Sequence, residues 1–366
     1  MVGGLLAKRV TLRDVARKVG VSHVAVSLAL RNDPSISLQR RVEIKQAAEQ
    51  MGYRPDPLLS SLAVYRRSQR PSRVGGALAW INHWDQPESL RQHKEFDSYW
   101  QGASEAAQRF GYHLDDIRWP MDCSAKRFER ILLARGVRGV LVPPHRGAPD
   151  WGDFDWNKFS IIRFGLSVQT PDSNLVTSDQ SRAVGMALAR IHEYGYERIG
   201  LVVPVTYDRR LGGNYYGGFC WGQKILQLKH GLPPLMTDEA AYKDQPDKAM
   251  EALRKWLARH KPDAILTAEV QVPAMLQQLG YRIPRDIAVA GTSGDVPVDA
   301  GINQHSEDIG RIAVEMLVKQ ININERGVPP TPYRILVESH WVDGASMPRR
   351  VPGGLTVDHL SGRSPR

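Results

Sequence analysis

The sequence predicts two unlike parts: a small all-α head, and a larger α/β body of two lobes built on doubly wound parallel sheets. Three observations support this division. Residues 11–31 read as two short helices separated by a glycine, and apolar strands alternate with amphipathic helices from about residue 74 to 347. The positive charge of the chain also lies almost entirely before residue 74. Alternation of strand and helix is typical of parallel sheets covered by helices on both faces.

The local sequence defines the helices of the head. Thr11 and Asp14 have the spacing of a capping box, in which each side chain bonds to the other residue's backbone N–H. Gly20 supplies the backbone freedom of a tight turn, and Ser22 suits the N-cap of the next helix. A third helix is expected over about residues 37–51, with apolar positions at Val42, Ile44 and Ala47.

Two short helices joined by a tight turn form a helix-turn-helix, which places its second helix in the major groove of duplex DNA. An ordinary three-helix surface bundle is the alternative interpretation. The inward face of the second helix is expected to hold Val26, Ala29 and Leu30. Residues left on its other faces, where bases and phosphates can lie, are His23, Val24, Ser27, Leu28 and Arg31.

The charge distribution favours DNA binding over the ordinary bundle. Residues 1–73 hold fourteen Lys and Arg but only five Asp and Glu, a net charge of +9 out of +10 for the whole chain. Neutralising phosphates requires such a concentration, whereas charge that serves only solubility is spread over the surface. We therefore expect the head to bind double-stranded DNA.

A short apolar segment follows the head. Pro55 and Pro57 end the third helix, and Asp56 suits the N-cap of a new helix with Pro57 at its first position. This helix is too short to be stable alone, so it would form only against a second copy, DNA or both. The alternative is a linker that happens to contain leucines. Its apolar residues are Leu58, Leu59, Leu62 and Ala63.

The head resembles that of the LacI/GalR family of transcription regulators, without a gap from about Val10 to Leu62. The resemblance implies a dimer on a palindromic operator, with residues 22–30 in the major groove and a hinge helix at 57–64 paired with its twin. Leu62 would wedge into the minor groove at the operator centre, as apolar side chains do in other DNA-bending proteins. The matching motifs are VTLRDVARKVGVS (10–22), Val26–Ser27, Ser-Ile-Ser (35–37) and GYRP (52–55).

The head departs from the family at a few positions. Ala25 and Leu28 stand where the family usually has Thr and Arg, and Leu59-Ser60 replaces the usual Ala-Arg of the hinge. Leu28 cannot form the bidentate hydrogen bonds that Arg makes with guanine, but it can touch a thymine methyl group. The operator sequence is therefore expected to differ. The remaining candidate DNA contacts are Thr11, Ser22, Ser35, Ser37, Arg40, Tyr53, Leu59 and Leu62.

The rest of the chain is long enough for two lobes. Near-continuous apolar strands fit sheets that are buried on both faces. Strands are predicted at 74–81, 112–118, 138–142, 159–164, 198–203, 263–267 and 287–290, and helices at 97–110, 124–135, 180–194, 214–229, 247–260, 270–279 and 305–325.

The body resembles the periplasmic-binding-protein-like (type I) effector domain that follows this head in the family. The resemblance implies three chain crossings between the lobes, near residues 178, 303 and 331. A ligand would lie in the cleft at the carboxyl ends of the strands, as open α/β sheets favour. The implied domains are a head (1–56), a hinge and linker (57–73), a two-lobed effector-binding and dimerisation body (74–347) and a disordered tail (348–366).

Four residues are candidate effector contacts. Matched by motif, the family's cleft Arg falls on Tyr215, its cleft Asn on Glu269 and its cleft acid on Ser293, and Trp84 follows the first strand. Aromatic faces beside carboxylates suit a saccharide, and through the family we expect a carbohydrate or polyol. Because Glu269 repels anions and Tyr215 replaces the family's cation, a neutral polyhydroxylated or cationic ligand is expected rather than a sugar phosphate or acid.

Other chemistry finds little support. Cys123 and Cys220 lack metal-ligand spacing and are expected to be free thiols, and the glycine pairs at 212–213 and 217–218 lack phosphate-loop spacing. The sequence shows no catalytic pattern of a nucleophile, a base and a group that orients the base. We therefore expect neither an enzyme nor a cofactor or metal. The first ten residues do not form a signal peptide, and no stretch suits a membrane span. We therefore expect a cytoplasmic protein.

The sequence thus predicts a dimeric, ligand-responsive transcription regulator that acts as a repressor. Two alternatives remain open. A DNA-binding regulator that senses no small molecule is suggested by the three altered cleft positions. A solute-binding protein with a fused basic head is the second alternative.

Overall fold

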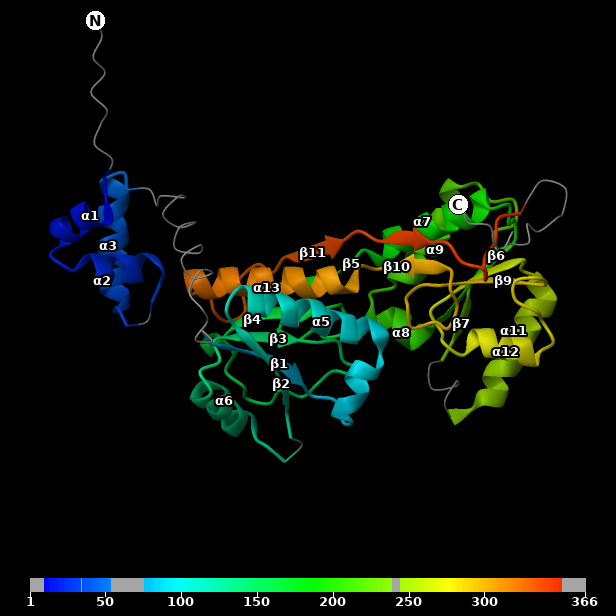
Figure 1. The fold of residues 1–366 in the computed structure, drawn as a ribbon, viewed down its shortest axis with the longest axis horizontal. Coiled ribbons are helices and arrows are strands. Elements are labelled where there is room, and N and C mark those ends of the chain that lie inside the picture. Colours follow the sequence, from blue (N-terminus) through cyan, green and yellow to red (C-terminus); the bar gives the residue numbers. More distant parts are fainter. Residues whose placement is uncertain (1–9, 34, 54–75, 121, 239–243, 351–366) are drawn as a thin grey trace, which may run out of the picture.

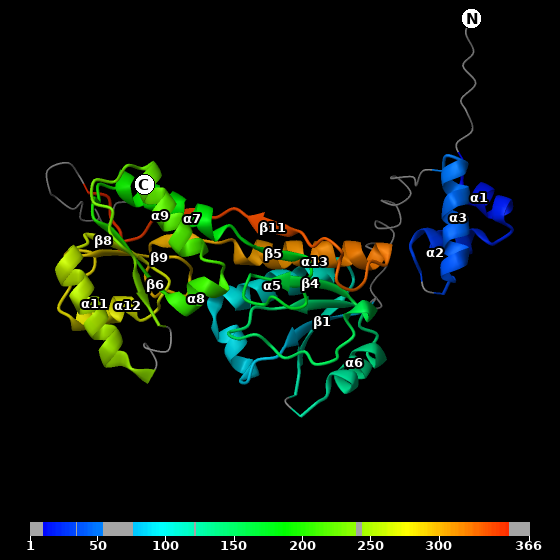
Figure 2. The ribbon, with the colours of Figure 1, turned by 180° about the vertical axis from the view of Figure 1, so that it is seen from behind.

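The computed structural model describes residues 10–33, 35–53, 76–120, 122–238 and 244–350. Three helices form the head, and two α/β lobes form the body (Figures 1 and 2). This arrangement confirms the predicted fold class. The hinge helix, Leu59, Leu62 and residues 351–366 of the predicted tail lie outside the described residues.

Each helix of the head begins at a side chain that caps it. Thr11 and Asp14 form the predicted capping box, Ser22 accepts a hydrogen bond from the N–H of Ala25, and Ser37 accepts one from Arg40. Gly20 ends the first helix in the left-handed conformation (φ 67°), which glycine adopts without strain. The helices are α1 (Leu12–Val19), α2 (His23–Leu30) and α3 (Leu38–Gln50).

The head has its own apolar core. Val15, Val26, Ala29 and Ile44 are fully buried where the three helices meet. Of the apolar positions named for this helix, Val42 does not face the core, because it is 46% exposed. Residues 42 and 44 lie about 200° apart around a helix, so they cannot both face the core. In α3, the inward face is formed by Ile44, Ala47 and Ala48.

The first lobe contains a six-stranded parallel sheet in the order β11-β5-β4-β3-β1-β2. Residues along β1 alternate between two apolar cores. Leu78 and Trp80 pack toward one face, whereas Ala79 and Ile81 pack toward the other. The strands are β1 (Ala77–Asn82), β2 (His113–Arg118), β3 (Gly139–Val142), β4 (Ser160–Phe164), β5 (Leu175–Ser178) and β11 (Arg334–Val337).

Helices cover both faces of this sheet. Helices α5 and α13 lie on one face and pack so closely that Gly102 and Gly310 each touch the backbone of the other helix. A Cβ at either glycine would overlap that backbone, so the two helices form one unit. Helix α6 covers the other face, where Phe128 stacks on Trp119. The helices are α5 (Lys94–Arg109), α6 (Ala125–Ala134) and α13 (Ser306–Ile323), with short 3₁₀ segments at Pro87–Gln92 and Trp156–Lys158.

The second lobe repeats this plan. Its six-stranded sheet has the order β12-β10-β9-β8-β6-β7, and only the β10–β12 pair is antiparallel. Helices α7 and α9 cover one face, and α11 and α12 cover the other. The strands are β6 (Ile199–Pro204), β7 (Leu235–Thr237), β8 (Ala264–Thr267), β9 (Ala288–Gly291), β10 (Gly301–Asn303) and β12 (His340–Val342). The helices are α7 (Gln180–Glu193), α8 (Val205–Arg210), α9 (Asn214–Ile225), α11 (Pro246–His260) and α12 (Val272–Gln278).

The chain crosses between the lobes three times. The first two crossings, at Ser178–Gln180 and Asn303–Ser306, lie where the sequence predicts them. The third was expected near residue 331 and lies instead between Val337 and His340. Residues 334–337 first pair with β5 as an edge strand of the first sheet, and this delays the crossing.

Hydrogen bonds tie the crossings to one another. Gln304 is buried and accepts a hydrogen bond from the hydroxyl of Ser178. The rings of His305 and His340 are in contact, with Nε2 of the first 2.7 Å from Nδ1 of the second. The three crossings are therefore connected to one another, and together they form the interlobe hinge, which is distinct from the predicted hinge helix that follows the head. No helix among the described residues is long and apolar enough to cross a membrane.

Candidate nucleic-acid interface and interlobe cleft

Helix α2 presents a free face beside the core of the head. Ser22, His23 and Val24 are exposed at its N-terminal end, and Ser27 and Leu28 are half-buried one turn further on. This is the end that contacts base edges when such a helix lies in the major groove. The absence of acidic residues in the first turn of α2 also suits an approach to phosphates.

Several predicted contact residues already have partners within the head. The hydroxyl of Thr11 donates to Asp14 (2.6 Å), and Arg31 Nε donates to the carbonyl of Ser27 (3.1 Å). Arg40 Nη2 donates to the carbonyl of Val19 at the end of α1 (2.9 Å). These bonds fix the helix-turn-helix, so the side chains support the DNA-facing surface as well as carrying charge.

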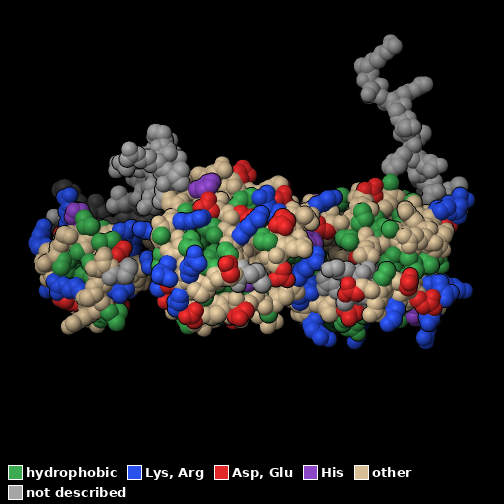
Figure 3. Space-filling view, turned by 90° about the horizontal axis from the view of Figure 1, so that it is seen from below, with side chains coloured by type: hydrophobic (Ala, Val, Ile, Leu, Met, Phe, Trp, Pro, Cys, Tyr) green, Lys and Arg blue, Asp and Glu red, His purple; other side chains and the backbone are tan. Residues whose placement is uncertain are grey.

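The surface of the head differs from that of the lobes. In Figure 3, Lys and Arg side chains surround an apolar area on the visible face of the head, whereas charges of both signs mix over the lobes. The exposed apolar residues of the described head include Val24, Leu38 and Val42. A basic rim around apolar contacts suits phosphates at the edge and bases at the centre.

A cavity with a volume of about 640 Å³ lies between the lobes of the body. It is lined by residues that follow the carboxyl ends of strands β1, β3, β4, β6, β8 and β9, together with the start of α5. Ligands bind at these strand ends in open α/β sheets. The volume is within the range of small-molecule sites.

All four predicted effector residues line this one cavity. Trp84 and Ser293 follow β1 and β9, Glu269 follows β8, and Tyr215 lies in the first turn of α9. Asp208 positions Tyr215 by accepting its backbone N–H (2.9 Å). The structure thus brings together residues from both lobes, although their contact with a ligand stays a prediction.

Aromatic rings form two walls of the cavity. Trp84 is 9% exposed, and its indole N–H donates to the carbonyl of Pro144 (2.9 Å), which fixes the ring. On the second lobe, Tyr207 stacks on Tyr215 with a centroid distance of 6.0 Å. Gln304 at the hinge donates to the hydroxyl of Tyr215 (3.3 Å). The aromatic wall of the second lobe is therefore hydrogen-bonded directly to the interlobe hinge.

Carboxylates outnumber guanidinium groups around the cavity. Burial raises the pKa of Glu95 to about 7, and the charge of nearby Asp295 adds to the effect, although the hydroxyl of Tyr99 donates to Glu95 (2.6 Å). Glu269 accepts the N–H of Gln271 (3.1 Å) at the start of α12. The acidic lining residues are Glu95, Asp238, Asp244, Glu269 and Asp295.

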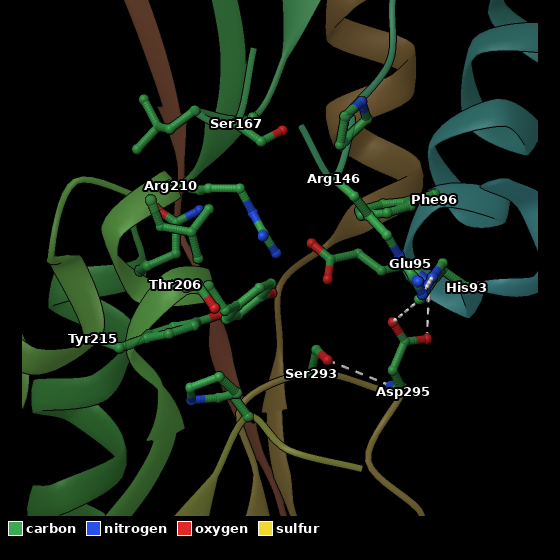
Figure 4. A pocket seen from close by; sticks show the side chains of 18 of the residues that line it. His93, Glu95, Phe96, Arg146, Ser167, Thr206, Arg210, Tyr215, Ser293 and Asp295 are labelled. Carbon is green, nitrogen blue, oxygen red and sulfur yellow. Dashed lines mark hydrogen bonds and ion pairs between the residues drawn. The ribbon is translucent and has the colours of Figure 1, made fainter. Parts of the chain in front are cut away.

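The cavity also contains cations that sequence reasoning missed. Arg210 lies over the ring of Tyr207 (5.6 Å), and Arg146 lies over Trp84 (5.3 Å). Figure 4 shows Arg210 and Glu95 reaching into the cavity from opposite sides. The expectation that Tyr215 leaves the cleft without the family's cation is therefore incomplete, because two guanidinium groups line it. Arg146 lies in the loop after the carboxyl end of β3, and Arg210 ends α8, the short helix directly after β6. These positions are the signal that could have identified them.

His145 lines the cavity, but both nitrogens of its ring have partners within the protein. Burial lowers its pKa to about 4, so the ring is neutral near pH 7. Its Nδ1 lies 2.8 Å from the carbonyl of Pro143, and its Nε2 accepts the N–H of His83 (3.2 Å). The Nδ1 contact therefore holds the ring within the loop after β3, and the Nε2 contact joins that loop to the loop after β1.

The described residues contain no group of three or more His, Cys, Asp or Glu positioned to hold a metal ion. Cys123 and Cys220 are both free thiols, as the sequence predicts.

Comparison with known families decides what this architecture is. The family described as bacterial regulatory proteins, lacI family, matches residues 11–56, and the periplasmic binding protein-like domain matches residues 188–347. The chain is a LacI-family regulatory protein. This finding confirms the resemblances drawn from the head and from the body.

Curated relatives of this LacI-family chain match along most of its length. The transcriptional regulator KdgR of Bacillus subtilis (strain 168) is 24% identical over 339 residues, which cover 88% of this chain and 94% of that protein. The repressor PurR of Haemophilus influenzae (strain ATCC 51907 / DSM 11121 / KW20 / Rd) is 23% identical over 333 residues, covering 87% and 93%. These relatives are transcriptional regulators rather than enzymes.

Solved structures of other regulators share the fold. The complex of the transcriptional regulator CelR with cellobiose has a TM-score of 0.56 and 21% identity, covering 92% of this chain and 100% of that one. The lac repressor dimer bound to operator and the anti-inducer ONPF has a TM-score of 0.51 and 17% identity, covering 93% and 99%. These likenesses support the two-lobed body and the all-α head.

Proposed function

We propose that this LacI-family protein is a dimeric repressor that binds a palindromic operator and is controlled by a small polyhydroxylated ligand in the interlobe cleft. The observation that carries the proposal is the combination of an exposed helix α2 on a basic head with a cavity of about 640 Å³ in the body. One part supplies affinity for DNA, and the other supplies a site whose occupancy can change with a metabolite.

The operator would be read by α2 in the major groove. His23, Val24 and Ser27 lie at the end that approaches bases, and Leu28 offers an apolar surface for a thymine methyl group. Leu62, outside the described residues, would be the minor-groove wedge. We expect Leu62→Ala to reduce DNA bending, measured by end-to-end fluorescence transfer, without loss of the dimer. Unchanged bending would remove the wedge.

The ligand class follows from the lining of the cleft. Sugar C–H faces pack against aromatic rings, which Trp84 and Tyr215 supply. Sugar hydroxyls need hydrogen-bond partners, and the Glu269 carboxylate is an acceptor for them. The excess of carboxylates over guanidinium groups disfavours sugar phosphates and acids. The related CelR structure contains cellobiose, which supports a neutral saccharide here.

Control would operate through closure of the lobes. A ligand that binds one lobe arrangement more tightly than another shifts the balance between them. Because the cavity is lined from both lobes, its occupant contacts both lobes. The lobes would move relative to each other about the interlobe hinge. The first lobes of the dimer would then change position relative to each other and alter the pairing of the hinge helices.

Two measurements test the proposal. Thermal shift of the full chain against neutral sugars, amino sugars and sugar phosphates should identify a stabilising neutral or amino sugar. Fluorescence anisotropy with an operator selected from random DNA should then change on adding that sugar. Stabilisation by sugar phosphates alone would contradict the ligand class, and operator binding without response to any ligand would favour a regulator without an effector.

A further inference from the structure

The start of helix α5 in the first lobe lacks a cap from its own segment. His93 occupies the N-cap position, but its side chain makes no capping hydrogen bond. The first N–H groups of a helix have no partner within it and need one from elsewhere. The N–H of Glu95 finds this partner in the second lobe, where Asp295 Oδ1 accepts it at 3.4 Å.

Asp295 makes a second contact across the cleft. Its Oδ2 lies 3.6 Å from Nδ1 of His93, so one carboxylate meets both the N-cap side chain and a first-turn N–H of α5 (Figure 4). A negative charge at this position is also favoured by the positive end of the helix dipole. Asp295 is thus placed to replace the missing cap from the opposite lobe.

Both sides of this contact are held in place. Asp295 follows Ser293, whose hydroxyl accepts the N–H of Asp295 (3.4 Å). On the first lobe, Arg146 Nη2 lies 3.2 Å from Nε2 of His93. A tautomer with its proton on Nδ1 accepts from Arg146 and donates toward Asp295, so the three groups form one connected row.

We propose that Asp295 is a positioning residue that holds the lobes together at the cleft by capping α5 from the second lobe. Because α5 and α13 pack as one unit through Gly102 and Gly310, holding the start of α5 fixes the first lobe as a whole. The row also lines the ligand cavity, so an occupant of the cavity touches the groups that set closure. The role of this contact in regulation rests on the proposed function, whereas the contact itself does not.

The experiment measures lobe separation without ligand or DNA. Spin labels at Asp153→Cys in the first lobe and Lys255→Cys in the second, in a Cys220→Ser background, report the distance between lobes by pulsed electron resonance. Both labelled positions are largely exposed, and Cys123 is buried. Asp295→Ala should raise the population of longer distances about fivefold, as expected for the loss of one charged cap.

Hydrogen exchange on the same full-length variants tests the cap directly. Exchange of the Glu95 amide should quicken about fivefold or more in Asp295→Ala. It should quicken less in Asp295→Asn, which keeps an acceptor but loses the charge and serves if the alanine variant is poorly folded. Ser124→Ala is the matched control, because Ser124 caps α6 within the first lobe. It should quicken exchange at the start of α6 and leave lobe separation unchanged.

The possible outcomes separate clearly. An unchanged distance distribution in both Asp295 variants overturns the proposal, as does a longer distance with unchanged exchange at Glu95. Failure of the sugar panel would remove the proposed effector but leave this measurement intact. A shift in both readouts, absent from Ser124→Ala, establishes Asp295 as the interlobe cap.

Discussion

The head and the cleft gather their binding groups in different ways. In the head, the exposed face of α2 and its supporting caps come from residues 11–40, and each capping hydrogen bond joins residues three positions apart. In the cleft, Asp295 meets Glu95 across 200 residues of sequence, and the cavity is lined from both lobes. The binding surface of the head is therefore built from residues close in sequence. The cleft, in contrast, forms only when the two sheets are correctly placed relative to each other. Charge follows the same division, since the head and linker (residues 1–73) carry +9 of the net charge of +10.

Removing the head gives the sharpest test of this division. Deletion of residues 1–72 should abolish operator binding, because the recognition helix and nearly all the excess positive charge are lost. The body should remain folded and dimeric, since its cores lie within the two lobes. Fluorescence anisotropy with operator DNA and sedimentation velocity measure both results. Specific operator binding by the truncated body would refute the assignment of the head.

Salt should affect the head far more than the cleft. A dimer that contacts several phosphates is expected to lose roughly a thousandfold in DNA affinity between about 50 and 200 mM salt. A neutral ligand in the cleft releases no counterions, so its affinity should change by less than about twofold. Titrations of both ligands over this range of salt give the comparison. A flat DNA profile would mean that phosphate contacts do not dominate binding.

A single carboxylate tests the cleft. Glu269→Ala should weaken binding of the sugar identified by thermal shift by about 1–3 kcal/mol, because ligand hydroxyls lose a buried acceptor. Operator affinity without ligand should stay normal, since Glu269 lies in the second lobe. Glu251→Ala is the matched control, because this carboxylate lies on α11, pairs with Arg254 and does not line the cavity. Calorimetry showing equal affinities in Glu269→Ala and wild type would exclude Glu269 from the site.

The smallest expected effect concerns the pH dependence of the body. The pKa of Glu95 rises to about 7 on folding, so the folded chain holds an extra proton between about pH 4.5 and 7. The contribution of Glu95 to the free energy of unfolding must therefore fall as the pH rises through this window. At pH 8, Glu95→Gln should be more stable than wild type by roughly 1–2 kcal/mol, with little difference at pH 4.5.

Glu105 supplies the control for this pH effect. Its carboxylate lies on the same helix, is 69% exposed and pairs with Arg109, so Glu105→Gln should leave the pH profile unchanged. Denaturant unfolding at pH 4.5, 6 and 8 measures all three proteins. Parallel profiles for Glu95→Gln and wild type would show that Glu95 is not protonated in this range.

The sequence predicts the head better than the body, because the head depends on contacts between residues close in sequence. The head helices were predictable because Thr11, Ser22 and Ser37 cap them locally and Gly20 breaks them. In the body, seven apolar strands alternate clearly with helices and were predicted. The sequence did not predict β5, β7, β10, β11 and β12, each three or four residues long. The third crossing was misplaced for that reason, since its position depends on pairing of the edge strand β11.

The composition of the cleft was only partly predictable. Trp84, Tyr215, Glu269 and Ser293 could be found because each follows a strand or matches a family motif, and the structure places them around one cavity. Asp295 could not, because its meeting with α5 depends on the relative placement of the two lobes. Lobe placement is set by three crossings far apart in the sequence, which no local pattern encodes.

The discontinuous first lobe has a consequence for synthesis on the ribosome. Its strands β1 to β5 are complete at residue 178, but α13 and β11, which cover one face and one edge of the sheet, come only at residues 306–337. At about 5–20 residues per second, β3, β4 and β5 wait on the order of ten seconds for α13, which packs on this face beside α5 and shares its apolar core with Leu141, Ile162 and Val176. The head is fully synthesised by then, whereas the first lobe still lacks α13 and β11. Chaperone capture during translation is therefore expected to concentrate on the first lobe.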